Sequence, residues 1–268
     1  HPSYGQKFMT EQIKKVPAEA GITEPAPLEN PVLISDLHLT TKKPATIMGF
    51  FRFMKDVAPH YSELVILGDL FDFWIGDDAM AAEPIIAQLK LYSSLGHRLL
   101  IMPGNRDVML GEDFARACGA ELLAPQVKVN IKGRDVLLSH GDEWCLRDKE
   151  YQAFRAMVRN PQWQRMALSK SVAERMAMAT NARSQSEGDK TAKTEAEMDV
   201  VETAVAESAR AFGVDCVIHG HTHKPMAHVA GAVERWVIPD WELDDAKGGG
   251  RSGCIAFLEN GRPQIKMF

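Results

Sequence analysis

Three histidines alternate in the stretch HGHTHKP, where His219, His221 and His223 occupy every second position. On extended backbone, side chains at alternate positions face the same side, so all three imidazoles could meet one ion. The chain has only nine histidines in 268 residues, which makes this cluster stand out. The spacing predicts metal binding, but it leaves open which of the three bind and how many ions are present.

Further nitrogen and oxygen ligands follow other apolar runs, at Asp36, His38, Asp69, Asn105 and His140. A lone Asp in such a place is more often a helix cap, and a lone His is more often a hydrogen-bonded core residue. The coincidence favours metal binding, because ligands of open α/β sheets collect outside the carboxyl ends of the strands. Carboxylate, imidazole and amide together suit Mn²⁺, Fe²⁺ or Zn²⁺ rather than structural zinc, which favours cysteine.

These ligands exceed what one tetrahedral site can use, so two metals are indicated. Two ions about 3.5–4 Å apart form a clamp for displacement at phosphorus and activate water as a nucleophile. A carboxylate has two oxygens with which to bridge them, and Asp69 is the predicted bridge. Arg106 fits beside Asn105 as a bidentate phosphate donor, because a guanidinium keeps its charge at neutral pH.

The apolar runs before these ligands are predicted to be buried strands, at 31–35, 63–68, 97–104, 135–141 and 215–220. Stretches with helical spacing at 43–58 and 80–95 alternate with them, which predicts an α/β sheet with covering helices. Beyond residue 226 short strands follow, and Asn260-Gly261 between apolar runs predicts a hairpin.

Residues 148–211 carry no strand signal and are predicted to form a helical insertion, with Pro161 separating its first two helices. A polar linker is expected at 181–194. A cap over the site and a solvated helical hairpin that only supports the sheet are equal alternatives from the residues alone.

The sequence predicts an N-terminal extension at 1–30, flexible and rich in Pro and Glu, followed by one domain at 31–268. HPSYGQKF is interpreted as a tag remnant, with Met9 as a plausible native start. The hydrophobic content of 45% and charged content of 25% are typical of a soluble globular protein. The net charge of −5 argues against nucleic acid as a partner.

Neither a membrane-spanning run of about 18–20 apolar residues nor the apolar core of a signal peptide is found in the sequence. The four cysteines, Cys118, Cys145, Cys216 and Cys254, form no C-x-x-C pair. We expect them to be reduced, mostly buried thiols of a cytoplasmic protein.

The motifs D-x-H, G-D-x-x-D, G-N-R-D, H-G-D and G-H-T-H, in this order, resemble the calcineurin-like metallophosphoesterase superfamily over residues 31–225. The resemblance implies a four-layer αββα sandwich with a dinuclear centre. It places Asp36, His38, Asp69 and His223 on one metal and Asp69, Asn105, His140 and His221 on the other. His219 closes the apolar run CVIH and is interpreted as a supporting residue.

Longer stretches, ISDLHL, ILGDLFDFWIGDD, GNRDVMLG, HGDEWCLRDKEYQAFR and IHGHTHKP, resemble the UDP-2,3-diacylglucosamine pyrophosphohydrolase family of lipid A biosynthesis, which also has a helical insertion. The resemblance implies hydrolysis of UDP-2,3-diacylglucosamine to UMP and 2,3-diacylglucosamine 1-phosphate, with two Mn²⁺ ions and activated water attacking the α-phosphorus. It implies Asp69, Asn105 and Arg106 as catalytic residues. The implied substrate contacts are Asn105, Arg106, Asp148, Tyr151, Arg183, Ser186, Lys190, Lys193 and His221.

Two departures from the family patterns matter. Arg106 stands where many phosphoesterases have a His that could act as general acid, but a phosphate leaving group has less need of a proton. The segment IPDWELDDAKGGGRSG keeps the aromatic residue of the usual pattern at Trp241, but has Glu242 where His is common and a longer loop. The role of the loop at 239–253 stays open.

A substrate with two acyl chains requires an apolar groove, which we expect on the helical insertion near Phe154 and Met157. The enzyme would then be peripheral on the cytoplasmic face of the inner membrane of a Gram-negative bacterium, with no obligate protein partner. A phosphodiesterase or pyrophosphatase for another nucleotide is the alternative, since the metal motifs alone do not choose the substrate. A scaffold protein of this fold would be expected to lose ligands, and none is missing.

Overall fold

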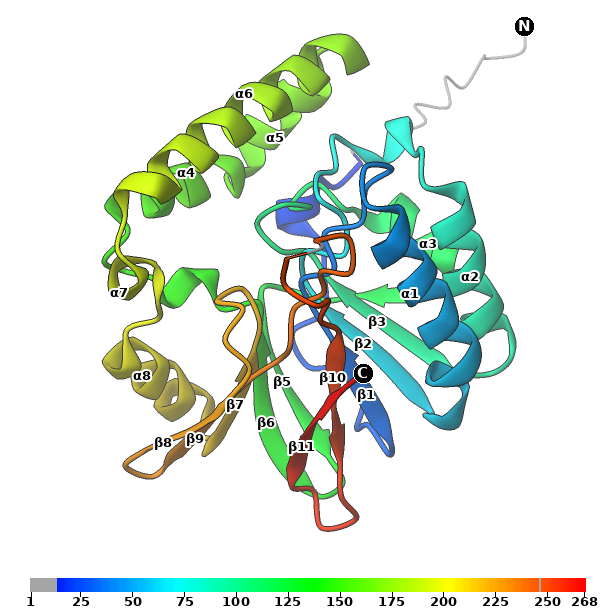
Figure 1. Ribbon diagram of the computed structural model, residues 1–268, viewed down its shortest axis with the longest axis vertical. Coiled ribbons are helices and arrows are strands. Elements are labelled where there is room, and N and C mark those ends of the chain that lie inside the picture. Colours follow the sequence, from blue (N-terminus) through cyan, green and yellow to red (C-terminus); the bar gives the residue numbers. More distant parts are fainter. Residues whose placement is uncertain (1–13, 246) are drawn as a thin grey trace, which may run out of the picture.

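The computed structural model describes residues 14–245 and 247–268, and within them two β-sheets face each other (Figure 1). The six-stranded sheet has the order β11-β10-β1-β2-β3-β4 and the five-stranded sheet the order β5-β6-β7-β9-β8. The first contains β1 (Pro31–Ile34), β2 (Glu63–Leu67), β3 (Arg98–Met102), β4 (Ala120–Leu122), β10 (Gly253–Phe257) and β11 (Pro263–Met267). The second contains β5 (Gln126–Ile131), β6 (Arg134–Ser139), β7 (Cys216–His219), β8 (Ala227–Ala230) and β9 (Val233–Val237).

The strands that carry the predicted ligands run parallel in the middle of each sheet. In the first sheet Leu33 of β1 lies opposite Val65 of β2, which lies opposite Leu100 of β3. In the second sheet β7 pairs in parallel with both β6 and β9. Parallel strands end at a common edge, so the residues after them are brought together there.

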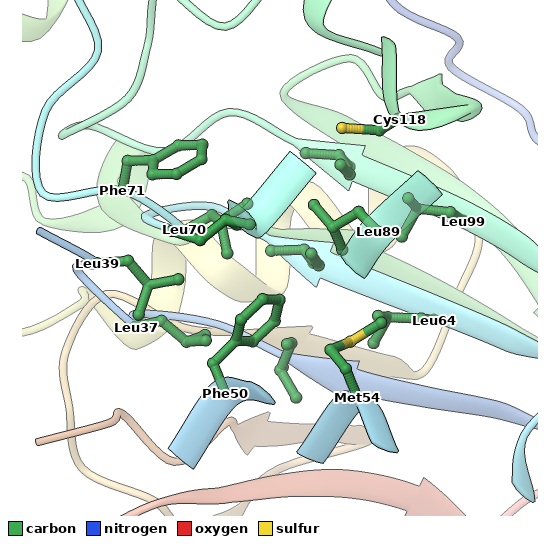
Figure 2. Close-up of a cluster of buried hydrophobic side chains, with 14 of the residues drawn as sticks. Leu37, Leu39, Phe50, Met54, Leu64, Leu70, Phe71, Leu89, Leu99 and Cys118 are labelled. Atoms are coloured by element: carbon green, nitrogen blue, oxygen red, sulfur yellow. The ribbon is translucent and has the colours of Figure 1, made fainter. Parts of the chain in front are cut away.

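Alternate residues of β1 divide the apolar core into layers. Val32 and Ile34 pack under α1 (Pro44–Asp56), α2 (Glu83–Ser94) and α3 (Glu112–Cys118), whereas Leu33 packs between the sheets. Figure 2 shows part of the outer cluster, where Met54 of α1 and Leu89 of α2 reach the strand residues. Each fully buried aliphatic side chain contributes roughly 1.5–3 kcal/mol to folding.

The outer face of the second sheet is covered by α8 (Glu202–Phe212), whose Val205 and Ala209 pack on Leu137 and Val217. The order of layers is therefore helix, sheet, sheet, helix, and the predicted αββα architecture is confirmed. The predicted strands all form, and the Asn260-Gly261 hairpin joins β10 to β11 as expected. Three elements were not predicted from the sequence, namely α3, β4 and β5. The first two are short, and β5 alternates between buried and half-buried residues.

The helical insertion comprises α4 (Lys149–Val158), α5 (Pro161–Leu168), α6 (Val172–Ala192) and α7 (Glu195–Met198), followed by α8. Pro161 is the first residue of α5 and Asn160 caps it, so the predicted break is confirmed. The polar linker predicted at 181–194 is wrong, because α6 continues through it. This stretch lacks proline, and half of its residues are Ala, Gln, Glu, Lys or Arg, which favour helix. In Figure 1, α4, α5 and α6 lie beyond the ends of the sheets.

The segment at 14–30 packs against the domain, which differs from the flexible extension expected there. Val16 and Leu28 are buried, and Leu28 forms a bridge with Ile131 of β5. The backbone amide of Ala18 donates to Gln164 of α5 at 2.8 Å. Residues 1–13, with the tag-like stretch and Met9, lie outside the described residues. Short 3₁₀ helices occur at η1 (Pro17–Glu19), η2 (Ala58–His60), η3 (Asp77–Ala79) and η4 (Asp142–Trp144).

All four cysteines are unpaired and buried, as predicted. Burial raises the pKa of the Cys118 thiol to about 12, which keeps it protonated and unreactive. Among the described residues, none of the helices combines the length and the apolar character that a bilayer crossing requires.

Candidate active site

The predicted metal ligands form two adjoining groups at the carboxyl ends of the central strands. The ligand atoms within each group lie within 4.8 Å of one another, in the sets Asp36, His38 and His223 and Asp69, His140 and His221. Oδ2 of Asp69 joins them, because it lies 3.1 Å from Nε2 of His38 and 3.4 Å from Nε2 of His140. The structure therefore brings together donors for two neighbouring cations.

Asp69 is fixed by backbone contacts on every side. Its Oδ1 accepts from the amide of Arg106 at 2.9 Å, and its own amide donates to Oδ1 of Asp107 at 3.1 Å. A Cβ at Gly104 would lie 2.2 Å from Oδ1 of Asp69, so only glycine fits there. Oδ1 takes part in this backbone contact, and Oδ2, which lies near both His38 and His140, is the oxygen placed to bridge the two groups.

Asp107, the last residue of the GNRD motif, is a supporting residue that the sequence analysis missed. Its carboxylate accepts from the amides of Gly104 at 2.7 Å and Phe71 at 3.2 Å, besides that of Asp69. Burial, followed by the charge of Asp69, raises the pKa of Asp107 to about 7. Its position in the GNRD motif is the feature of the sequence that could have pointed to it.

The turn after β7 closes on Asp36. The amide of His221 donates to Oδ2 of Asp36 at 2.8 Å, and the Ser35 hydroxyl donates to the same oxygen at 2.7 Å. A Cβ at Gly220 would lie 2.2 Å from the Ser35 hydroxyl oxygen, so the glycine allows this approach. Oδ1 of Asp36 is left facing Nε2 of His223 at 3.3 Å.

The histidine rings differ in what their second nitrogen contacts. Nδ1 of His140 donates to the carbonyl of Leu67 at 2.8 Å, which turns Nε2 toward Oδ1 of Asn105, also at 2.8 Å. Nδ1 of His219 donates to the carbonyl of Gly220, and its Nε2 accepts from Arg235 at 3.0 Å. His219 therefore lies outside both ligand groups, with both nitrogens engaged.

Positive φ angles concentrate in this cluster. Of the six non-glycine residues with positive φ in the described part of the chain, Lys132 alone is remote from the predicted ligands. The other five are Asp36, His38, Asp69, His221 and His223, with φ between 48° and 70°. Such backbone costs about 1–3 kcal/mol per residue and persists where function requires it.

The charges of the cluster fit a cation. Burial raises the pKa of Asp36, but His140 and His223 lower it more strongly, to about 2. Burial lowers the pKa of His140, but Asp69 and Asp36 raise it well above the usual range. Burial and His140 hold the pKa of His221 at about 4, so this imidazole is neutral and available as a ligand. Oxygen and nitrogen donors without a thiolate match the ions expected from the sequence.

A cavity of about 670 Å³ opens over these ligands, between the strand ends and the helical insertion. Its lining includes every predicted substrate contact except Arg183, namely Asn105, Arg106, Asp148, Tyr151, Ser186, Lys190, Lys193 and His221. Burial and the nearby charge of Arg106 lower the pKa of Lys190. Neither Lys190 nor Arg106 forms an ion pair with a carboxylate among the described residues, so both are available to an anion.

Arg183 is directed elsewhere, toward the loop that follows β2. It pairs with Asp72 and lies 3.4 Å from Glu187 of its own helix. Two turns earlier, Arg175 makes a bidentate ion pair with Asp78 at 2.5 and 2.8 Å. These pairs attach α6 to the segment that begins at Asp69, so Arg183 acts here as an anchor of α6.

Asp142, of the H-G-D motif, attaches α4 in the same way and was also missed from the sequence. Its Oδ2 accepts from the Tyr151 hydroxyl at 2.6 Å and from Nε of Arg155 at 3.0 Å. The Tyr151 ring lies with its centroid 5.6 Å from that of His221. The first helix of the insertion thus contacts a predicted ligand.

Comparison with known proteins agrees with this geometry. The family model described as calcineurin-like phosphoesterase matches residues 31–225. A UDP-2,3-diacylglucosamine hydrolase of Bordetella pertussis is 44% identical over 82% of this chain and 88% of its own length. Proteins of the same name are 43% identical in Cellvibrio japonicus, over 79% of this chain and 91% of the relative, and 38% identical in Haemophilus influenzae, over 82% and 93%.

Proposed function

The chain belongs to the calcineurin-like phosphoesterases, and within them to the family of the UDP-2,3-diacylglucosamine hydrolases, and on this premise we propose that it hydrolyses the pyrophosphate bond of UDP-2,3-diacylglucosamine. The products are UMP and 2,3-diacylglucosamine 1-phosphate, in lipid A biosynthesis. The observation that carries the proposal is the cavity in which two unpaired cations, Arg106 and Lys190, meet the two ligand groups joined by Asp69.

Asp36, His38, Asp69 and His223 would hold one divalent ion, and Asp69, Asn105, His140 and His221 the other. When bound, the ions supply Lewis-acid stabilisation of the phosphoryl oxygens and lower the pKa of water. We propose Mn²⁺ for both positions, since hard carboxylate oxygens belong to both sets and the second set adds the amide oxygen of Asn105.

Arg106 and Asn105 orient the phosphoryl group that is attacked. The guanidinium donates two parallel hydrogen bonds and cannot lose its proton, so it stabilises charge without acting as a general acid. The leaving group is a phosphate monoester, which departs without full protonation. Lys190 lines the same cavity and neutralises the second phosphate, while Lys193 contacts the substrate beside its ion-pair partner Asp148.

Asp148 links the substrate cavity to the helical insertion. It caps α4 by accepting from the Tyr151 amide at 3.2 Å, and it pairs with Lys193 at 2.8 Å. This ion pair joins the beginning of α4 to the residue that follows α6. It therefore connects the two helices on either side of the cavity. We propose that α4 and α6 thereby close the cavity against water while the lipid sugar is bound.

The acyl chains would extend along α4. Phe154 lines the cavity, whereas Met157 is 44% exposed and lies outside its lining. Three further apolar side chains are exposed on the insertion, Met166, Val172 and Met176, and Leu146 is exposed just before it. We propose that they contact the cytoplasmic face of the inner membrane, where a diacylated substrate resides, and that no protein partner or nucleic acid is required.

Release of UMP from UDP-2,3-diacylglucosamine in the presence of Mn²⁺ tests the proposal. In water enriched in ¹⁸O, attack at the α-phosphorus places the label in UMP, while attack at the other phosphorus places it in the lipid product. Hydrolysis of generic phosphodiesters without turnover of the lipid nucleotide would overturn the substrate assignment. Phe154→Asp should abolish turnover of the acylated substrate with metal content intact, and Met157→Asp, at an exposed position of the same helix, should reduce it by less. Unchanged kinetics in both variants would contradict the acyl groove.

A further inference from the structure

The loop at 239–253, whose role the sequence left open, supplies a buried carboxylate to one of the predicted ligands. Asp240 is 2% exposed, and its Oδ2 lies 3.5 Å from Nδ1 of His223. On the other side of the ring, Nε2 of His223 lies 3.3 Å from Oδ1 of Asp36. The imidazole is therefore placed between two carboxylates, one at each nitrogen.

The 3.5 Å contact with Asp240 favours the tautomer that carries its proton on Nδ1. Nε2, on the side of Asp36, is then left to bind the ion that Asp36 and His38 would share. A carboxylate behind a ligand histidine fixes its orientation and makes it a stronger base. His140 is backed instead by the neutral carbonyl of Leu67, so the two ligand groups differ in this respect.

Asp240 is itself held in place from two directions. Arg251 donates to it through Nε at 2.9 Å and through Nη2 at 2.8 Å. The amide of the next residue, Trp241, donates to the backbone carbonyl of Asp36 at 3.0 Å. The carboxylate is thus tied to the same strand end that presents Asp36.

The rest of the loop is anchored on α1. Asp244 accepts from the amides of Ala45 and Thr46, both at 2.9 Å, and so caps a helix that has no side-chain cap of its own. Glu242 pairs with Lys43 at 2.5 Å and exchanges two backbone hydrogen bonds with Arg251. The segment that carries Arg251 is therefore held in place by these contacts.

We propose that Asp240 is a positioning residue for His223, held by Arg251, and that it strengthens binding of the ion assigned to Asp36, His38 and His223. The inference rests on the proposed metal centre but not on the proposed lipid substrate. It assigns the 239–253 loop a part in metal binding, although none of the described residues of the loop belongs to the two ligand groups.

Mn²⁺ titration of the purified, metal-stripped protein, followed by electron paramagnetic resonance, tests the inference without substrate. The wild type should bind two ions and show the exchange-coupled spectrum of a pair. In Asp240→Asn, which keeps the shape of the side chain but removes its charge, one ion should bind about 10–100-fold more weakly. At Mn²⁺ concentrations that fill both wild-type positions, the spectrum should be that of single ions.

Arg251→Met and Asp245→Asn complete the set. Arg251→Met should weaken the same ion several-fold, by less than Asp240→Asn, and the double variant should match Asp240→Asn alone. Asp245→Asn removes a carboxylate from the same loop and should leave both ions unchanged. Equal weakening by Arg251→Met and Asp240→Asn would overturn the inference, because loop closure alone would then explain the loss.

Two ions bound with wild-type affinity by Asp240→Asn would also overturn it. A wild-type protein that binds fewer than two ions would overturn the proposed metal centre together with this inference. If the metal binding is as expected but no UMP is released from UDP-2,3-diacylglucosamine, only the proposed substrate would be overturned.

Discussion

The ligand cluster and the helical insertion face the same cavity but are built in opposite ways. Asp36 and Asp69 are almost completely buried, and backbone amides fix one oxygen of each. In α6, which spans 21 residues, Arg175 is the only buried residue, and ion pairs of Arg175 and Arg183 attach the helix to the loop after β2. The reacting groups are thus set by the sheets, and the substrate contacts by an element with few buried contacts.

The difference suggests a division of tasks. Positions that must hold cations to a fraction of an ångström sit on strand ends inside a packed core. The proposed substrate contacts Ser186 and Lys190 sit on α6, a helix that little apolar burial stabilises, and such elements open at lower free energy than the core. Variants of the two regions should therefore fail in different ways.

Asp69→Ala should have the largest effect, because it removes the donor shared by both ligand groups. Metal stabilisation is worth several kcal/mol, so we expect turnover to fall by at least about 10³-fold. Bound Mn²⁺ per chain, measured by elemental analysis, should fall as well. Asp135→Ala, at an exposed position, is the control and should change neither quantity. Turnover within tenfold of wild type would contradict the shared role of Asp69.

Arg106→Ala should come next. Loss of one preorganised charge-stabilising donor costs about 10²–10³-fold in kcat. Mn²⁺ binding should be unchanged, which separates this variant from Asp69→Ala. Arg106→Lys should recover only part of the rate, because an ammonium cannot donate in bidentate fashion. Full recovery by lysine would reduce the role of Arg106 to charge alone.

Lys190→Ala should act mainly on KM. A hydrogen bond to a charged group contributes about 1.5–3 kcal/mol, so KM for the lipid nucleotide should rise roughly tenfold or more. Lys149→Ala, on exposed α4 surface outside the cavity lining, is the matched control. A fall in kcat with KM unchanged would place Lys190 at the reacting phosphate instead of the second one.

Arg175→Met should have the smallest effect and would probe the attachment of α6. Asp78 is partly exposed, so the pair is worth about 1 kcal/mol, and KM should rise several-fold. Proteolysis within 172–194 should become faster while Mn²⁺ affinity stays constant. Asp78→Asn keeps the hydrogen bonds of Arg175 to the carbonyls of Ile75 and Lys170, so it should act in the same direction by less and add little in the double variant. A change in Mn²⁺ affinity would show that the two regions are more tightly coupled than their contacts indicate.

The sequence indicated that these side chains would lie together because they directly follow short apolar runs that are typical of buried strands. It predicted α6 poorly, since a mostly polar helix has no apolar stripe to reveal its period. Asp142 and Asp240 were missed for another reason. Each acts on a partner that only the folded chain brings near, as Asp240 does on His223, seventeen residues away. For Arg183, motif position suggested the substrate, while the folded chain offers it Asp72.

The positive φ angles of the ligand cluster have a consequence for protein engineering. Glycine adopts such backbone without steric cost, whereas each histidine or aspartate held there carries part of that cost. A library of metal-free chains selected for heat resistance should therefore enrich glycine at His38 and His223, before the hydrogen-bonded carboxylates Asp36 and Asp69, and yield stable but inactive molecules. Selection in the presence of Mn²⁺ should reverse this bias, since the binding energy then counts toward the folded state.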